Sequence, residues 1–167
     1  KQYTPDGSVV KTFAFDSKVS NFDNLLRLRN GLLFVGAGNC RLVRFDPATE
    51  RFEYFSFAHL FRDKASGVRI VALAEGENGM LWVGTQFGLV KCVPLPPKPP
   101  SLGGAHGFDF QLIEAKQNKR DGLNNNSIAS ILPDPVNPGK TLWLGTKGGG
   151  INRMDIGTGM VQHITTA

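Results

Sequence analysis

The residues of this sequence that could do acid–base chemistry lie where turns are expected. The sequence contains no Gly-x-Ser-x-Gly elbow, no phosphate-binding P-loop and no His-Glu-x-x-His zinc motif. Asp46 and Asp134 stand beside proline, and Asp155 is followed two residues later by glycine, which is typical of turn and strand-end carboxylates. Glu75 and Glu77 flank a turn as well. We therefore expect no catalytic residue and no enzyme activity in this chain.

The sulfur and imidazole side chains do not form a metal signature. Cys40, Cys92, His59, His106 and His163 are spread along the 167 residues without the spacing of a zinc site. Two cysteines do not make a disulfide framework either. We expect no metal ion and no cofactor.

Recognition of a polar ligand is the chemistry that the connecting segments could support. The candidate ligand-binding residues are Asn39, Arg62, Lys64, Gln86, Phe87, Lys119, Arg120 and Lys147. Amides, cations and one aromatic ring suit a sugar or an acidic oligosaccharide. The alternative is that these residues only turn the chain and keep it soluble. The net charge of +5 is scattered and is not interleaved with aromatic residues, so we expect no nucleic-acid partner.

A repeated signature must position these connecting segments. Leu-Trp-Val-Gly-Thr at residues 81–85 recurs as Leu-Trp-Leu-Gly-Thr at 142–146, and a worn copy, Leu-Phe-Val-Gly-Ala, stands at 33–37. A unit of roughly 40–50 residues that reads as strands throughout has the size of one propeller blade. The repeat therefore determines the predicted fold.

Four short apolar runs per unit, separated by turn signals, predict four antiparallel strands per blade. We predict an all-β fold, a β-propeller fragment of about three four-stranded antiparallel blades with one extra N-terminal strand. The expected strands are 22–29, 32–37, 41–46, 51–57, 68–74, 80–85, 88–93, 108–114, 127–132, 141–146, 150–155 and 160–165.

The units divide the chain as follows. Residues 1–20 are expected to end a preceding blade, and the three blades are expected at 21–58, 66–115 and 124–167, the second with a proline-rich insert at 94–107. That insert could be an SH3-type ligand or a linker, but strand patterning resumes at residue 108 and favours a decorated loop. Propellers have about 4–8 blades. We therefore expect a fragment whose partners are other blades of a parent propeller, and which self-associates in isolation.

The aromatic residue and the glycine of each signature are predicted to be structural. A large ring on the second strand can fill the space between blades, and the glycine permits a close approach that a side chain would block. These residues are Phe34 with Gly36, Trp82 with Gly84, and Trp143 with Gly145. We expect both tryptophans to be largely buried.

Strand direction places the candidate ligand-binding residues on one face. In a blade whose strands alternate in direction, the connection from the fourth strand to the next blade and the turn between strands two and three share an end. Loops at that end commonly bind ligands in propellers.

The signature, extended to Leu-Trp-Val/Leu-Gly-Thr-x-x-Gly-Leu/Ile, resembles the two-component regulator propeller repeat. Residues 121–126, Asp-Gly-Leu-Asn-Asn-Asn, resemble the Asp-Gly-Leu-x-x-Asn lead-in that opens such repeats. The resemblance covers nearly the whole chain and is strongest over 68–92 and 121–164. It is weaker over 22–55, where Phe34 and Ala37 replace the tryptophan and threonine. In that family the repeats form extracytoplasmic sensors of hybrid histidine kinases, chiefly in Bacteroidetes-type bacteria, and many respond to glycans.

The resemblance implies a non-catalytic, ligand-sensing part of a periplasmic propeller that responds to an oligosaccharide. The parent would be a hybrid two-component sensor histidine kinase anchored in the inner membrane, with its kinase activity outside this chain. One alternative is a scaffold that dimerises receptor ectodomains without a small ligand. The other is a streptogramin-lyase-like propeller enzyme, although such repeats read Gly-x-Leu-Trp-Phe, and Val or Leu followed by Gly-Thr favours the sensor type.

Overall fold

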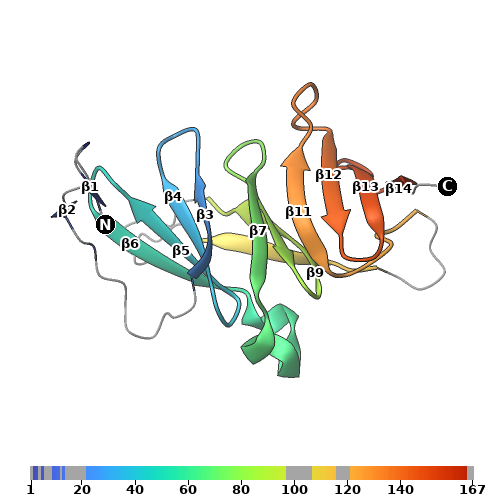
Figure 1. Cartoon of the computed structure of the whole chain (residues 1–167), viewed down its shortest axis with the longest axis horizontal. Coiled ribbons are helices and arrows are strands. Elements are labelled where there is room, and N and C mark those ends of the chain that lie inside the picture. The colour runs from blue at the N-terminus through green and yellow to red at the C-terminus, as the bar shows by residue number, and fades with distance from the viewer. Residues whose placement is uncertain are drawn as a thin grey trace.

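Three four-stranded antiparallel sheets dominate the computed structural model, which describes residues 2–3, 5, 9–11, 13, 22–96, 107–115 and 121–164. Figure 1 shows the sheets side by side along the long axis of the molecule. The first blade contains β3 (Phe22–Arg27), β4 (Leu33–Ala37), β5 (Arg41–Asp46) and β6 (Arg51–Ser56). The second contains β7 (Ile70–Glu75), β8 (Leu81–Thr85), β9 (Gly88–Pro94) and β10 (Phe108–Ile113). The third contains β11 (Ile128–Pro133), β12 (Thr141–Thr146), β13 (Gly150–Asp155) and β14 (Val161–Ile164).

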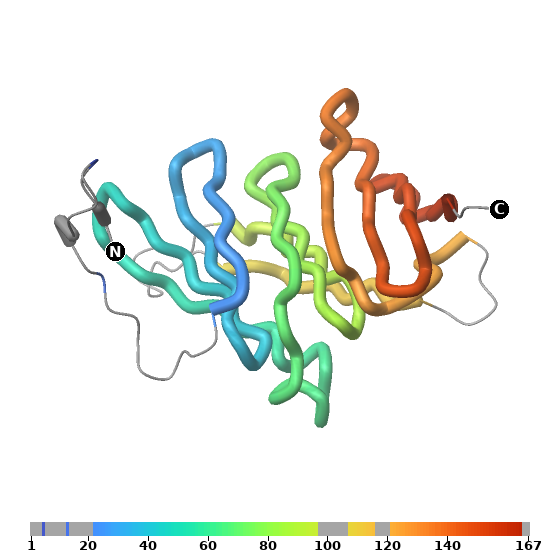
Figure 2. Tube along the Cα trace, in the orientation of Figure 1, coloured from blue at the N-terminus to red at the C-terminus, as the bar shows by residue number. Residues whose placement is uncertain are grey.

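Each sheet is a meander in which every strand pairs with its sequence neighbour. The blades meet through their first strands, because β7 packs beside β3 on one side and beside β11 on the other. In Figure 2 the turns that follow these three strands are the blue, green and orange loops along the upper side of the trace. The predicted all-β propeller architecture of three blades is confirmed.

The N-terminal segment differs from the single strand that we expected. Two short strands, β1 (Gln2–Tyr3) and β2 (Val9–Lys11), pair antiparallel with each other. The Pro-Asp-Gly sequence at residues 5–7 has strong turn chemistry, which allows the chain to fold back on itself.

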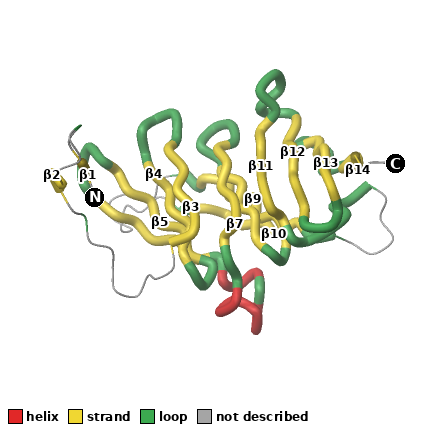
Figure 3. Tube along the Cα trace, in the orientation of Figure 1, coloured by secondary structure: helices red, strands yellow, loops and turns green. Residues whose placement is uncertain are grey.

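Two short 3-10 helices interrupt the connection between the first and second blades. They are η1 (Ala58–Leu60) and η2 (Arg62–Gly67), the red segment below the sheets in Figure 3. None of the helices in the described part of the chain is long and apolar enough to cross a membrane. Most of the proline-rich insert, residues 97–106, lies outside the described residues, and the amide of Leu95 donates to the carbonyl of Gly107 across its base at 2.9 Å.

All three blades share an irregularity at the start of the first strand. The register shifts between Phe22 and Asn24, between Ile70 and Ala72, and between Ile128 and Ser130. Such a bulge bends the strand and redirects a side chain. In the second and third blades the redirected isoleucine points into the preceding blade.

The glycine of the signature receives that isoleucine. A Cβ on Gly36 would lie 2.7 Å from Cγ2 of Ile70, and a Cβ on Gly84 would lie 2.7 Å from Cγ2 of Ile128. Real side chains do not approach so closely, so each glycine is required by the next blade rather than by its own strand.

The aromatic residue of the signature packs at the same contacts. Phe34 belongs to the core between the first and second blades, and Trp82 to the core between the second and third, where it is 1% exposed. Trp143 occupies the equivalent place in the third blade, but no blade among the described residues covers it and it is only half-buried. Trp82 is therefore buried between two blades as expected, whereas Trp143 has intermediate exposure at a flank that no described blade covers.

Candidate functional site

A groove of about 430 Å³ opens on the face where the fourth-to-first and second-to-third connections meet. It lies beside the two 3-10 helices and the β8–β9 turn. The residues that line it are Leu60, Phe61, Arg62, Asp63, Lys64, Phe87, Leu112, Glu114 and Asn126. Three predicted ligand-binding residues, Arg62, Lys64 and Phe87, thus meet in one place.

Phe61 fixes the polar wall of the groove to the core. Its side chain is buried, and its ring lies 6.1 Å from that of Phe57 beneath the helices. The amide of Phe61 donates to the carbonyl of Ala58 at 3.0 Å, and the amide of Lys64 donates to the carbonyl of Phe61 at 3.0 Å. With this anchor inside, the side chains of Arg62 and Lys64 are left on the exposed surface.

The buried thiol of Cys40 links the second 3-10 helix, η2, to the first blade. The Cys40 Sγ donates to the carbonyl of Ala65 at 3.5 Å from a β4–β5 turn in which Asn39 and Cys40 both adopt positive φ. Burial raises the pKa of Cys40 to about 11, so the thiol stays protonated at neutral pH. Cys40 therefore links the groove wall to the first blade.

Phe87 supplies the aromatic surface of the groove. Its turn is locked by Thr85, whose Oγ1 accepts from the Phe87 amide at 3.0 Å and donates to the Gly88 carbonyl at 2.9 Å. The Lys64 ammonium lies 5.4 Å from the centre of the Phe87 ring, within cation–π range. A flat apolar face beside a cation is an arrangement on which a sugar ring can stack while its hydroxyls find charged partners.

The opposite wall is acidic and amide-bearing. It consists of Glu114 and Asn126, which stand at the end of the second blade and at the entry to the third. The Asn126 Oδ1 accepts from the Ala115 amide at 2.5 Å, which holds this wall to the chain that leaves β10. The groove thus offers two cations and the carboxylate of Asp63 from one wall, a second carboxylate from the other, and two aromatic rings.

Three other predicted residues that the structure describes, Asn39, Gln86 and Lys147, do not line this groove. Gln86 is engaged with the backbone, since its Nε2 donates to Gly67 at 2.6 Å and its Oε1 accepts from the Arg69 amide at 2.9 Å. Asn39 lies in the β4–β5 turn of the first blade, and Lys147 lies in the β12–β13 turn of the third. Lys119 and Arg120 fall outside the described residues.

The sequence analysis missed part of the groove. Phe61, Glu114 and Asn126 gave no ligand signal, because an aromatic residue, a strand-end acid and a turn asparagine are common in any blade. The spacing of the connections was the available clue, since Glu114 and Asn126 border the connection that contains two predicted ligand-binding residues, Lys119 and Arg120.

The lead-in at residues 121–126 has a structural role. Asn124 is a hub, because its Oδ1 accepts from the Asn152 Nδ2 at 2.9 Å and from the Thr146 Oγ1 at 3.0 Å, while its Nδ2 donates to the Gly149 carbonyl. At the other side of the blade, the amide of Val161 donates to the carbonyl of Asp121 at 2.8 Å. The lead-in therefore pins the incoming chain to the third blade.

The histidine, cysteine and acidic side chains in the described part of the chain do not gather into a metal site. No group of three or more histidine, cysteine or acidic side chains there could hold a metal ion. Both cysteines are free and buried, and burial also raises the pKa of the Cys92 thiol.

Comparison with solved structures gives the chain its place among known folds. The extracellular domain of a putative hybrid two-component system from B. thetaiotaomicron matches 98% of this chain with a TM-score of 0.64 at 22% sequence identity. The same domain type from a second such system of that organism matches 84% with a TM-score of 0.58 at 20% identity. The chain has a β-propeller fold.

The same fold also occurs in an enzyme. A catalytically inactive variant of virginiamycin B lyase from Staphylococcus aureus, solved with quinupristin, matches 98% of this chain with a TM-score of 0.59 at 14% identity. The chain spans 18% of each two-component domain and 47% of the lyase. No protein-family model matches the chain, and no curated protein matches it in sequence.

Proposed function

We propose that this chain is part of the non-catalytic, ligand-sensing propeller of an extracytoplasmic two-component receptor, and that the ligand is an oligosaccharide. The groove carries the proposal, because Arg62, Lys64 and Phe87 come from two separate connections and line one groove together with Glu114. Ligand sites in propellers are commonly built from such loops on a fixed scaffold. The repeat signature and the fold shared with extracellular two-component domains agree with a receptor origin.

In this proposal each wall has a distinct role. Phe87 stacks on a sugar ring, Lys64 and Arg62 hold hydroxyl or acidic substituents, and Glu114 accepts hydroxyl hydrogen bonds from the other side. The parent receptor spans the inner membrane and places this propeller in the periplasm, with the kinase elsewhere in the parent.

A glycan array followed by isothermal titration calorimetry on this chain tests the proposal. We expect Phe87→Leu and Lys64→Gln each to weaken binding of the best oligosaccharide roughly tenfold, which corresponds to about 1.4 kcal/mol. Lys147→Gln is the matched control, because Lys147 lies in the equivalent turn of the third blade and does not line the groove. Absence of binding to neutral and acidic oligosaccharides alike, or equal binding by all three variants, would reject it.

A protein-interaction scaffold is the second candidate function. It is favoured by a separate observation, an apolar cavity of about 660 Å³ on the outer flank of the first blade. A scaffold would bind through that flank and would be indifferent to substitutions in the groove.

A further inference from the structure

A second cavity, of about 210 Å³, adjoins the groove. Its walls come from the end of β10, from the start of the lead-in at residues 121–123 and from the β13–β14 turn. Glu114 lines this second cavity and also lines the groove. The two cavities therefore meet at one carboxylate side chain.

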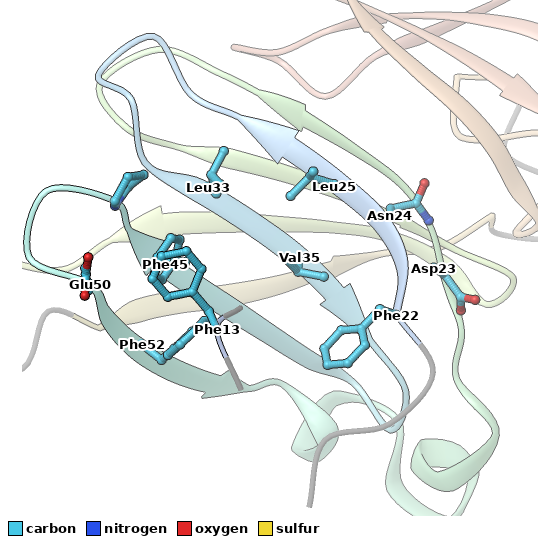
Figure 4. A pocket seen from close by; sticks show the side chains of 11 residues that line it. Phe13, Phe22, Asp23, Asn24, Leu25, Leu33, Val35, Phe45, Glu50 and Phe52 are labelled. Atoms are coloured by element: carbon cyan, nitrogen blue, oxygen red, sulfur yellow. The ribbon is translucent and has the colours of Figure 1, made fainter. Parts of the chain in front are cut away.

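Two blades of this chain enclose the second cavity. The apolar cavity in Figure 4 is placed differently, since Phe22, Leu25, Val35 and Phe45 line it on the outer flank of the first blade. The second cavity has the second blade on one side and the third blade on the other. Both of its walls are thus present in this chain, whichever blades precede or follow them.

The end of β10 separates the groove from the second cavity. Successive side chains of a strand point to opposite sides, so Leu112 lines the groove and Ile113 lines the second cavity. A Cβ on Gly88 would lie 2.8 Å from the Ile113 carbonyl oxygen and 3.5 Å from the Glu114 Cγ. The absence of a side chain at Gly88 therefore lets the end of β10 lie against the β8–β9 turn, which holds Glu114 at the boundary between the two cavities.

Hydrogen bonds fix the turn that forms the far wall of the second cavity. The Asp155 Oδ1 accepts from the Thr158 amide at 2.7 Å and from the Thr158 hydroxyl at 2.8 Å. The Asp155 amide donates to the Met160 carbonyl at 2.8 Å, and the Gly159 amide donates to the Asp155 carbonyl at 2.8 Å. This ordered turn presents the Met160 side chain, which is 58% exposed, as an apolar surface.

The lead-in supplies the polar wall of the second cavity. The Asp121 carbonyl accepts from the Val161 amide at 2.8 Å, and the Gly122 carbonyl lies 2.7 Å from the His163 Nε2. These contacts use the backbone of the lead-in, and the Asp121 residue itself is exposed. Asp121 and Glu114 give the cavity two carboxylates, and no lysine or arginine is among the described residues that line it. Such a lining accepts hydrogen bonds from hydroxyl groups and repels acidic groups.

We propose that the second cavity is a subsite for a neutral sugar unit, and that one oligosaccharide crosses the end of β10 with one unit in the groove and the next in this subsite. The inference rests on the proposed function, because it extends the same site. Pockets for whole ligands have volumes of about 300–1,000 Å³, so the smaller second cavity suits one unit of a longer ligand. Glu114 accepts hydroxyl hydrogen bonds from both units, Asp121 accepts them from the second unit, and Met160 packs against the apolar face of its ring.

Affinity as a function of glycan length tests the subsite. The probes are the neutral and acidic glycans of the array, from single sugars to hexasaccharides, and calorimetry then compares the best glycan with each of its monosaccharides. Met160→Glu places a charge in the second cavity, and Asp121→Asn removes one. Val136→Glu and Asp109→Asn are the matched controls, because both residues are exposed and neither is among the residues that line the two cavities. Circular dichroism checks that each variant keeps its strands.

The expected result separates the two cavities. The unchanged chain and both controls bind a glycan that contains a neutral unit at least roughly tenfold more tightly than any of its monosaccharides. Met160→Glu and Asp121→Asn each reduce this advantage roughly threefold to tenfold. Phe87→Leu weakens binding at every glycan length, because it changes the groove.

Three results would overturn the subsite and leave the proposed function standing. They are equal affinity for the best glycan and its monosaccharides, an advantage of the longer glycan that both second-cavity variants retain in full, and a best glycan that is acidic on every unit. Absence of binding to every glycan of the array would overturn the subsite together with the proposed function.

Discussion

The second and third blades carry the same signature residues in the same register, a tryptophan opposite a cation and a glycine opposite an aliphatic residue, yet the environments of these residues differ. Trp82 is almost fully buried and Gly84 is filled by Ile128 of the next blade. Trp143 is half-buried, and the nearest atom to a Cβ on Gly145 is the Ser130 Oγ of its own blade. Burial in this fold is therefore set by the neighbouring blade and not by the local sequence.

The hydrogen bonding of the two indole N–H groups also differs between the two blades. The Trp143 Nε1 donates to Asp134 Oδ2 at 2.8 Å at the open flank. The Trp82 Nε1 is buried and has no hydrogen-bond partner among the described residues, because Gly76 stands where the third blade has Asp134. The third blade holds its tryptophan with a polar contact, whereas the second holds its own by packing.

Replacing the two tryptophans should give the largest difference in stability between the second and third blades. We expect Trp82→Ala to lower the free energy of unfolding by roughly 3–5 kcal/mol, as for large core aromatics generally. Trp143→Ala should lower it by about 1–2 kcal/mol, because folding buries less apolar surface of Trp143 than of Trp82. Urea denaturation measures both values, and equal losses would remove the distinction between the two blades.

Replacing the two signature glycines should give the second-largest difference in stability. Gly84→Ala places a methyl group against Ile128, which is fixed between blades, and should cost about 1–3 kcal/mol by overpacking. Gly145→Ala meets a serine hydroxyl that can rotate away, so its effect should stay within about 0.5 kcal/mol. Thermal unfolding followed by circular dichroism compares the pair, and a Gly145→Ala loss as large as that of Gly84→Ala would contradict the role assigned to Ile128.

Acid should affect the third blade more than the second. Hydrogen bonds from Trp143 and from the amides of Asn137 and Val136 lower the pKa of Asp134 below its ordinary value near 3.8. Because the folded-state pKa is depressed, the stabilisation is present above the ordinary pKa and disappears as the pH falls through the folded-state pKa.

A pH titration of tryptophan emission tests this difference. Below about pH 4 we expect the emission of Trp143 to shift as Asp134 is protonated. Trp82 should show no such shift while the protein stays folded. Asp134→Asn should abolish the acid-dependent shift, and a shift that persists in this variant would rule out Asp134 as its source.

The cations over the two rings should give the smallest difference. Lys91 and Arg153 each lie 5.9 Å from the centre of their tryptophan ring. Lys91→Ala should cost about 1 kcal/mol, because its stem is partly buried between blades. Arg153→Ala should cost about 0.5 kcal/mol or less, because water competes at the exposed flank. Denaturant titrations resolve the order of the pair, and a reversed order would contradict this account.

The strands could be predicted from the sequence because their signals are local. Alternating apolar residues bounded by turn residues predicted all twelve blade strands, with ends that differ from the structure by at most two residues. The close approach at Gly36 and Gly84 was also predicted, although only the structure identifies Ile70 and Ile128 as its cause.

The site was harder to predict because its residues meet only in the folded chain. Arg62, Lys64 and Phe87 were chosen from their loops, but Gln86 from the same turn is engaged with the backbone. Glu114 and Asn126 complete the groove from segments that carried no ligand signal. The half-burial of Trp143 could not be read from a signature that it shares with Trp82.

Acrylamide quenching of two single-tryptophan variants tests the central claim, that the neighbouring blade determines burial, most directly. Trp143→Phe leaves only Trp82, and Trp82→Phe leaves only Trp143. The account predicts that Trp82 resists quenching and that Trp143 is readily quenched in the folded protein. Equal accessibility of the two indoles would contradict it.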